Sequence, residues 1–137
     1  MLNENEIIDA VCPYLEANGY RIIQRLSTTE KGVDIVGQRI GTSEIINVEA
    51  KGGTSSRAGS SRFGKPYTKS QVFDLVSKGF FATCRLVSKR KNESESVMLA
   101  VPDESWFRTY IESISPALST LQIKVLLVSD SRSVRQF

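Results

Sequence analysis

The stretch INVEAKGG, residues 46–53, carries the pattern from which the fold can be predicted. Apolar and polar residues alternate along it, which is typical of a strand with one buried and one exposed face. The apolar side chains of one face belong to Ile46, Val48 and Ala50. Glu49 and Lys51 point together to the opposite face, because successive side chains of a strand alternate. The stretch therefore predicts a half-buried strand that ends in an acid and a lysine, directly before a Gly-Gly turn.

The preceding segment VDIVGQRI, residues 33–40, predicts a neighbouring strand, and residues 39–43 predict the hairpin turn between the two strands. Asp34 lies in this segment, fifteen residues before Glu49, although aspartate is unfavourable inside strands. Antiparallel pairing would bring the two carboxylates together, and a divalent cation between them would relieve their repulsion. The pair therefore indicates Mg²⁺ or Mn²⁺. The alternative interpretation of Asp34 is an exposed strand residue or a turn cap.

Upstream of this hairpin, the sequence predicts a helix followed by a strand. Residues 3–20 have the helical spacing of apolar positions, at Ile7, Ile8, Val11 and Leu15. Asn18-Gly19 predicts the helix end, whereas Pro13 removes a backbone donor and predicts a kink or an early break. The segment YRIIQRL, residues 20–26, then predicts the first strand.

Downstream of the Gly-Gly turn, the sequence predicts two helices and two buried strands. Thr68 begins a helix that we expect to run to about Lys91. Residues 96–102 and 123–130 are continuous apolar strands, separated by a helix that ends near Pro116. The predicted order is α-β-β-β-α-β-α-β, an α/β fold with a central mixed sheet flanked by helices. The length of 137 residues predicts a single domain, residues 1–137.

The composition restricts the chemistry that the protein can perform. The chain contains no histidine, which excludes Ser-His-Asp and Cys-His catalysis and argues against a zinc site. Cys12 and Cys84 are far apart in the sequence, so they are expected to be packing residues. The chain has no long apolar run, and its start is acidic where a secretory signal would be basic. We therefore expect a cytoplasmic protein without a membrane partner.

The positive charges are concentrated in one segment that contains no acid. Between Glu49 and Asp74, the chain places five cations around a Gly/Ser-rich loop: Lys51, Arg57, Arg62, Lys65 and Lys69. Phe63 and Tyr67 are interleaved with them, which is typical of a loop that meets phosphates. A solubilising surface is the alternative, and a second cluster of cations occupies residues 89–91.

One motif within this loop resembles a nucleotide-binding sequence but is incomplete. GSSRFGKP, residues 59–66, begins like a phosphate-binding P-loop. Pro66 stands where a P-loop needs the hydroxyl of Ser or Thr to bind Mg²⁺. We therefore predict no nucleotide cofactor and interpret the segment as a loop that faces the substrate.

The pattern of Asp34 followed by Glu49-Ala50-Lys51, on a hairpin preceded by an acidic helix, resembles the PD-(D/E)xK nuclease superfamily. Among its members, the chain looks most like archaeal Holliday-junction resolvases and Mrr-type domains. The proline that names the superfamily is missing, because Gly32-Val33 precedes Asp34 here. The resemblance implies a restriction-endonuclease-like fold.

The resemblance also implies roles for individual residues. Asp34 and Glu49 would bind the metal together with the Ala50 carbonyl, and Lys51 would orient the attacking water or neutralise charge on the phosphate. Family members often add a glutamate from the first helix, for which Glu6 is the best match and Glu4 the second. Asn3-x-x-Glu6 is equally a capping box, in which Glu6 would only close the helix start.

Two further sets of residues are expected to serve the substrate. Gln71 matches a glutamine that some relatives use to place the substrate, but Thr68-x-x-Gln71 is also a capping box. The residues expected to contact nucleic acid are Arg57, Arg62, Lys65, Tyr67 and Lys69.

The resemblance predicts a metal-dependent endonuclease that hydrolyses nucleic acid, with DNA, including branched or junction DNA, as the expected substrate. A homodimer is expected, because cutting both strands usually takes two sites related by a two-fold axis. Two alternatives remain open at this point. One is an RNA-cleaving toxin domain on the same fold, and the other is a non-catalytic module that binds nucleic acid.

Overall fold

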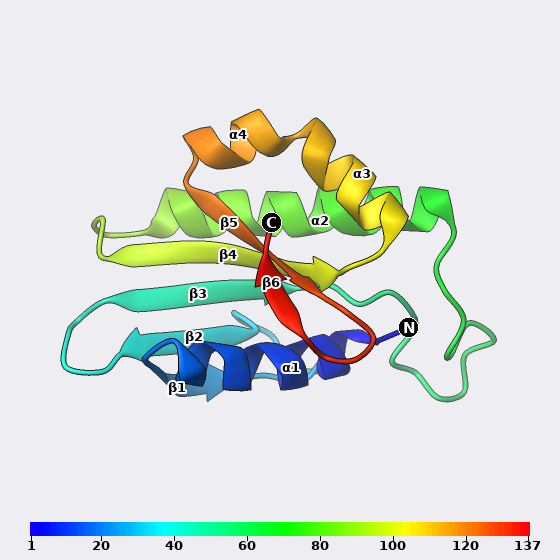
Figure 1. Ribbon diagram of the computed structural model, residues 1–137, viewed down its shortest axis with the longest axis horizontal. Coiled ribbons are helices and arrows are strands. Elements are labelled where there is room, and N and C mark those ends of the chain that lie inside the picture. Colours follow the sequence, from blue (N-terminus) through cyan, green and yellow to red (C-terminus); the bar gives the residue numbers. More distant parts are fainter.

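A six-stranded mixed sheet forms the centre of the computed structural model, which describes all residues from Met1 to Phe137 (Figure 1). The strands follow one another across the sheet in chain order: β1 (Tyr20–Arg25), β2 (Ile35–Arg39), β3 (Ile45–Ala50), β4 (Glu95–Pro102), β5 (Ile123–Val128) and β6 (Val134–Gln136). Strands β1, β2 and β3 pair antiparallel. Strands β3, β4 and β5 pair parallel, and β6 returns antiparallel to β5.

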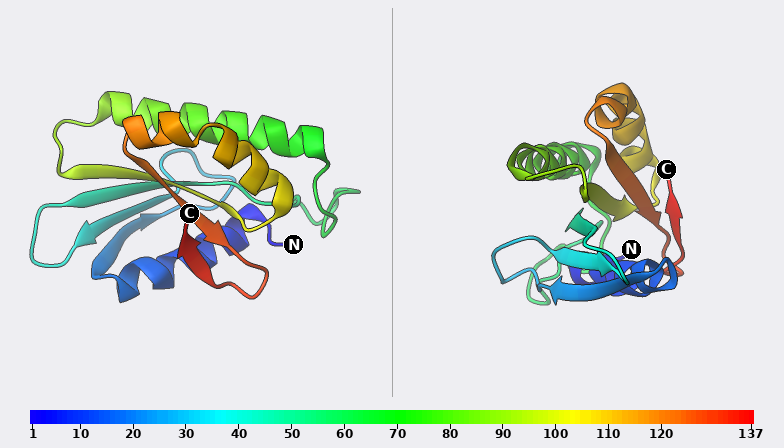
Figure 2. Two further views of the ribbon diagram at one scale, coloured as in Figure 1. Left: turned by 45° about the horizontal axis from the view of Figure 1, so that its top comes forward. Right: turned by 90° about the vertical axis from the view of Figure 1, so that its left-hand side faces the viewer.

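The helices cover both faces of this sheet. Helix α1 (Glu4–Ala17) lies on one face, and α2 (Lys69–Lys89), α3 (Ser105–Ser113) and α4 (Ser115–Thr120) lie on the other, as the end view in Figure 2 shows. Helix α2 connects the parallel pair β3 and β4, and α3 with α4 connects β4 and β5. Crossovers between neighbouring parallel strands share one hand, so these three helices fall on the same side of the sheet.

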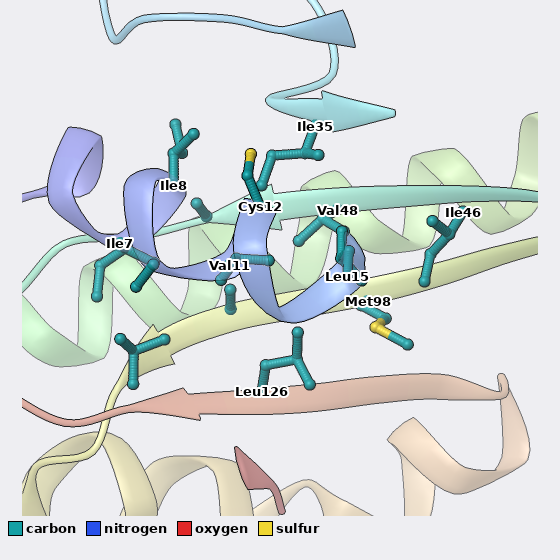
Figure 3. Packing of buried hydrophobic residues seen from close by; sticks show 14 of the residues in the cluster. Ile7, Ile8, Val11, Cys12, Leu15, Ile35, Ile46, Val48, Met98 and Leu126 are labelled. Atoms are coloured by element: carbon teal, nitrogen blue, oxygen red, sulfur yellow. The ribbon is translucent and has the colours of Figure 1, made fainter. Parts of the chain in front are cut away.

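The hydrophobic core is divided by the sheet into two clusters. The first lies between α1 and the sheet and includes the predicted buried face of β3, namely Ile46, Val48 and Ala50 (Figure 3). The second lies under α2 and α3 and includes Leu99 and Phe107. Strand β4 contributes to both clusters, because its side chains alternate between two covered faces. Cys12 belongs to the first cluster and Cys84 packs against the second, so both cysteines are packing residues as predicted.

Helix α1 continues through Pro13 to Ala17, so the predicted early break is wrong. A proline inside a helix removes one backbone hydrogen bond. Pro13 lies on the exposed face of α1, whereas Val11 and Leu15 are fully buried against the sheet. This packing stabilises the helix more than the missing hydrogen bond destabilises it.

The predicted α/β class with a mixed sheet is confirmed, and the predicted element order is wrong in two places near the carboxyl terminus. The helix expected to end near Pro116 ends at Ser113, and Pro116 lies in the first turn of the separate helix α4. Proline is favoured in a first turn, where its missing N–H would be unpaired in any case. Strand β6 was not predicted, because it is a three-residue edge strand with a polar sequence. None of the helices combines the length and the apolar character needed to cross a membrane.

Candidate active site

Antiparallel pairing of β2 and β3 brings Asp34 level with Glu49. Strands β2 and β3 pair with Ile35 opposite Val48, so the next residue on each strand is Asp34 on one side and Glu49 on the other. Ile35 and Val48 both face the core under α1, so the two acids are directed to the other face. Figure 1 shows that this point lies at the end of the molecule where β3 ends and both α1 and α2 begin.

Asp34 was expected inside the strand, but β2 begins one residue later, at Ile35. The reason is that the Ala50 N–H of β3 bonds to the Asp34 side chain and not to a backbone carbonyl of β2. Its Oδ2 atom accepts a hydrogen bond of 2.8 Å from the N–H of Ala50, the residue after Glu49. The N–H and C=O groups of one strand residue face the same neighbour, so the Ala50 carbonyl is directed to the same edge of β3 as Asp34.

Asp34 is a buried acid, with 8% of its surface exposed. Burial raises the pKa of Asp34 to about 6, and the nearby charge of Glu49 adds to this effect. The Ala50 hydrogen bond and the charge of Lys51 act in the opposite direction and only partly offset burial. The carboxyl group therefore lies in a position where its negative charge is incompletely compensated.

Glu49 and Lys51 form an ion pair at the end of β3. The Nζ atom of Lys51 lies 2.8 Å from Oε1 of Glu49. The exposed fraction is 15% for the Lys51 side chain and 14% for the Glu49 side chain. Burial lowers the pKa of Lys51, but the hydrogen bond and charge of Glu49, with the charges of Glu4 and Asp34, raise it above its ordinary value. Lys51 is therefore held in its charged form beside the two acids.

The aliphatic part of Lys51 rests against helix α2. A Cβ atom added to Gly79 would lie 3.3 Å from Cγ of Lys51 and 2.9 Å from Cδ1 of Leu99. Leu99 is completely buried, so it cannot move aside. The glycine thus allows α2 to approach β3 and β4 closely enough to fix the direction of the lysine side chain.

Glu4 is a third acid at this point, contributed by the first residue of α1. Burial raises the pKa of Glu4 to about 7, the charge of Lys51 opposes this, and the charges of Asp34 and Glu49 add to it. The chain after β3 lies directly against the start of α1. A Cβ atom on Gly52 would clash with the backbone nitrogen of Glu4, and the Gly53 N–H donates to the Leu2 carbonyl at 2.8 Å.

Glu6 occupies a different position from Glu4. Its Oε2 atom accepts a hydrogen bond of 2.8 Å from the Asn3 N–H, which completes the predicted capping box, and its other oxygen lies 3.6 Å from Arg132. The structure thus brings Glu4, and not Glu6, to Asp34 and Glu49. The sequence contained a signal for this, because Glu4 precedes Ile7 by three residues and Ile8 by four. This spacing places Glu4 on the same side of α1 as the buried residues Ile7, Ile8, Val11 and Leu15.

Gln71 also lies in a capping box. Its Oε1 atom accepts a hydrogen bond of 2.8 Å from the Thr68 N–H, and the Thr68 hydroxyl accepts one of 3.4 Å from the Gln71 N–H. Helix α2 begins at Lys69, one residue after the predicted Thr68 cap, and ends at Lys89. The structure thus gives Gln71 a structural role, and a role toward a substrate stays a prediction.

The loop of residues 52–66 follows β3 and lies at the same end of the molecule (Figure 1). The Thr54 hydroxyl donates to the Arg62 carbonyl at 2.8 Å, and the Tyr67 N–H donates to the Gly53 carbonyl at 3.0 Å. Burial raises the pKa of Tyr67, and the charge of Glu4 adds to this effect, so the phenol lies near the acids. An open groove of about 430 Å³ lies beside Tyr67 and is lined by Thr28, Thr29, Ser55, Ser56, Arg57 and Tyr67.

The predicted nucleic-acid contacts differ in how they are held. Arg57, Arg62 and Lys65 are exposed on the loop and form no salt bridge. Lys69 instead lies over the ring of Trp106, with Nζ 4.6 Å from the ring centre. Three of the predicted cations are therefore free to meet an anion, and the fourth is already engaged with α3.

The donor set at the end of β3 suits a hard divalent cation. The structure contains no group of three Cys, Asp or Glu side chains arranged to hold a metal ion. Mg²⁺ does not require such a group, because it is commonly bound by one or two carboxylates and retains several waters. Asp34, Glu49 and the Ala50 carbonyl supply oxygen ligands at one edge of β3. Burial raises the pKa values of Glu4 and Asp34, and the neighbouring acids add to this, so a cation bound here would favour their charged forms.

Comparison with known proteins supports the fold. Neither the family models nor the sequences of curated proteins contain a match to this chain. Among solved structures, the chain is similar to an fdxN element excision controlling factor protein from Anabaena variabilis, with a TM-score of 0.54 and 19% sequence identity. The alignment covers 96% of this chain and 97% of the other. At this level of identity, the likeness establishes a shared fold and nothing about activity.

Proposed function

We propose that the protein is a metal-dependent nuclease of the PD-(D/E)xK type, with the restriction-endonuclease-like fold. The observation that carries the proposal is the meeting of Asp34, Glu49 and Lys51 at the end of β3. The topology supports it, because a helix, three antiparallel strands and a helical crossover to a parallel strand follow in the order that the resemblance implies.

The residues at the end of β3 divide the work between them. Asp34, Glu49 and the Ala50 carbonyl would hold Mg²⁺ or Mn²⁺, which when bound supplies Lewis acidity and lowers the pKa of a bound water. Lys51 carries a fixed positive charge that stabilises the anionic charge developing on the phosphate. Glu4, the second match of the resemblance after Glu6, would be the additional carboxylate from the first helix.

The cations around the site would suit a polyanionic substrate, and we propose nucleic acid, with DNA as the first candidate. Arg57, Arg62 and Lys65 stand free on the loop beside the acids, where they would contact phosphates. Tyr67 lines the groove beside this loop and is close enough to Glu4 for the charge of that acid to raise its pKa, so its ring would meet a sugar or base next to the cleaved bond.

Cleavage assays with single-residue variants test the proposal. Glu49→Gln and Lys51→Met are expected to reduce Mg²⁺-dependent cleavage by at least about 100-fold, since each removes a charge that acts on the transition state. The substrates are single strands, duplex DNA, a four-way junction and tRNA, each with and without Mg²⁺ or Mn²⁺.

The matched controls for this assay are Glu112→Gln and Lys78→Met, which remove exposed charges without a hydrogen-bonded partner on α3 and α2. Both should leave cleavage unchanged. If either Glu49→Gln or Lys51→Met cuts as fast as the parent protein, the assignment of the active site is wrong.

A second candidate function is a non-catalytic module that binds nucleic acid. The closed ion pair between Glu49 and Lys51 favours it, because this pair is complete without a metal. Calorimetry separates the two functions. A nuclease should bind Mn²⁺ in a manner lost in Asp34→Asn, whereas the module should bind nucleic acid with salt-sensitive affinity and show no metal binding.

A further inference from the structure

The starts of α2 and α3 form a surface that continues from the end of β3. The Lys51 N–H donates to the Ala100 carbonyl of β4 at 2.9 Å. Two residues later, a Cβ atom on Gly53 would lie 3.1 Å from Cγ of Pro102, the last residue of β4. Asp103 and the start of α3 follow directly. Figure 1 shows the starts of α2 and α3 at the end of the molecule where β3 and β4 end.

Two arginines of this surface share one acid. The Asp103 carboxylate accepts hydrogen bonds from Arg108 of α3 and, at 3.1 and 3.4 Å, from Nε and Nη2 of Arg135 of β6. The Asp103 side chain is 17% exposed, whereas those of Arg108 and Arg135 are 42% and 58% exposed. A guanidinium has five N–H donors, and Asp103 takes only a minority of them. The cluster therefore carries a net positive charge and has donors left for an anion.

Lys69 is the third cation of this surface, and it has no acidic partner. It is exposed, forms no salt bridge, and lies with Nζ 4.6 Å from the centre of the Trp106 ring. The ring holds the ammonium without neutralising it. Glu104, the acid beside Trp106 in the sequence, instead caps α3 by accepting from the N–H groups of Trp106 and Phe107 at 3.0 and 3.2 Å. The positive charge of Lys69 therefore remains available to an anion.

Trp106 adds an exposed aromatic ring to these cations. Its exposed fraction is 38%, whereas the next residue, Phe107, is buried at 1%. Aromatic rings among cations are typical of surfaces that bind single-stranded nucleic acid, because the rings stack on bases and the cations meet phosphates. The faces of paired bases are covered by their neighbours in a duplex, so stacking on a protein ring needs an unpaired nucleotide. The ring therefore favours an unpaired strand as the ligand.

The spacing of the cations fits a strand that runs on from the cleaved bond. Neighbouring strands of a sheet are about 4.8 Å apart, so Arg135 on β6 lies about 14 Å across the sheet from Glu49 on β3. Lys69 lies between them in the chain of contacts, because Tyr67, two residues earlier, donates to the Gly53 carbonyl at 3.0 Å. A nucleic-acid strand covers this distance with a few nucleotides, since it advances about 3.4 Å for each one.

We propose that Lys69, Trp106, Arg108 and Arg135, here called the α3 patch, bind an unpaired strand of nucleic acid that continues from the cleaved bond. The phosphates of this strand meet the three cations, and one base stacks on Trp106. The inference rests on the proposed nuclease function and adds the class of substrate, namely a nucleic acid with single-stranded nucleotides beside the cleaved bond. A blunt duplex would occupy the site without the patch.

Binding of two DNA duplexes, one blunt and one with a single-stranded tail, tests the inference. Ca²⁺ in place of Mg²⁺ keeps both substrates intact. The tailed duplex should bind about tenfold more tightly and should quench the fluorescence of Trp106, the only tryptophan of the chain. Trp106→Leu should remove most of this advantage. Equal affinities of the parent protein for the two duplexes, or a tail that leaves the fluorescence unchanged, would overturn the inference.

Salt dependence shows whether the cations of the α3 patch meet phosphates. Arg135→Gln and Lys69→Gln should each reduce the slope of log affinity for the tailed duplex against log salt by about 0.7, the effect of one lost contact to a single strand. Lys78→Gln and Arg85→Gln are the matched controls, at exposed positions of α2 outside the patch, and should leave the slope unchanged. Slopes that are the same in all four variants would contradict the assignment.

Asp103→Asn separates phosphate binding from a purely structural role of the two arginines. The variant removes the acid that Arg108 and Arg135 share, so their full charge becomes available and the tailed duplex should bind more tightly. If the arginines only connect β4, α3 and β6, Asp103→Asn should not strengthen binding, and the inference is then wrong.

The result is distinguishable from that of the nuclease test. A parent protein that cleaves blunt and tailed duplexes equally, with no change in Trp106 fluorescence, would remove the α3 patch and leave the nuclease proposal in place. A parent protein that cleaves neither substrate with Mg²⁺ or Mn²⁺ would remove the nuclease proposal and the inference that rests on it.

Discussion

Glu4 and Asp34 are acids whose folded environment disfavours their charged forms. Their pKa values rise from 4.5 to about 7 and from 3.8 to about 6, in both cases mainly through burial. Below about pH 4, both groups are neutral in the folded and unfolded chain, and their contribution to stability is fully present. As the pH rises, the unfolded chain releases these protons first. Stability contributed by the two acids is therefore lost progressively until the pH passes about 7.

Glu4→Gln should flatten this pH dependence in the absence of divalent cations. The amide carries no charge at any pH, so the variant avoids the cost of burying the Glu4 carboxylate. We expect a gain on the order of 1 kcal/mol in the free energy of unfolding near pH 8, after allowance for solvent screening, and little change near pH 5. Urea unfolding with a chelator present, at several pH values, measures this directly.

The control for this experiment is Glu112→Gln, which removes an exposed glutamate from α3. It should leave the slope of stability against pH as it is in the parent protein. Equal slopes in Glu4→Gln and the parent protein would show that Glu4 is ionised without cost in the folded state.

The residues of the site could be predicted to different degrees. The alternation of β3 and its hairpin with β2 were sufficient to bring Asp34 to Glu49 and to place Lys51 beside them, because register follows from local pairing. Glu4 was only the second choice, since its place depends on the contact of Gly52 with the start of α1, which is distant in sequence. The hydrogen bond from Ala50 to the Asp34 side chain also had no sequence signal.

At the scale of elements, the close approach of α2 to β3 and β4 depends on Gly79. Gly79→Val should lower the free energy of unfolding by about 2 kcal/mol, because the new side chain would clash with the buried Leu99. The higher helix propensity of valine relative to glycine offsets little of this loss, since β-branched side chains are restricted in helices. It should also reduce cleavage, since the stem of Lys51 is displaced. Denaturant unfolding and the cleavage assay measure the two effects separately.

Gly59→Val is the matched control, because a Cβ atom at Gly59 would meet no atom within 4 Å. Its stability should lie within about 0.5 kcal/mol of the parent protein, as expected for an exposed position. If Gly79→Val is as stable as Gly59→Val, α2 does not depend on the glycine for its packing.

The elements with a strong periodic pattern could be predicted, and those decided by packing or by edge pairing could not. The two-residue period of β3 and the apolar runs of β4 and β5 mark strands whose burial is visible in the sequence. Pro116 has no such pattern, because a proline can end one helix or begin the next. Strand β6 exists only because it pairs with the edge of β5.

Across the whole molecule, two groups of cations lie at opposite ends of α2, and only one of these ends carries the site. Arg57, Arg62 and Lys65 lie beside the site, at the end where α2 begins, and residues 89–91 lie at the end where it stops (Figure 1). A nucleic acid bound at the site should therefore contact the first group and not the second.

Salt dependence of duplex binding measures which cations take part. Removing Arg62 by Arg62→Ala should weaken binding and reduce the slope of log affinity against log salt by about 0.9, because one phosphate contact is lost. Fluorescence anisotropy with Ca²⁺ in place of Mg²⁺ keeps the duplex intact during the measurement.

Arg90→Ala provides the comparison from the other end of α2. It removes the same charge, so a purely nonspecific attraction to the whole protein would give the same loss of slope as Arg62→Ala. An unchanged slope in Arg90→Ala is the result expected for binding at the site.

The contact between Gly52 and the start of α1 has a consequence for the order of folding. Glu4, Asp34 and Lys51 come from three separate segments, and β3 meets its parallel neighbour β4 only after α2 has been added to the chain. Closing such distant loops is slow, and it follows the formation of local helices and hairpins. A chain still emerging from the ribosome would therefore carry these acids and the lysine without assembling them, so that the site forms only in the finished molecule.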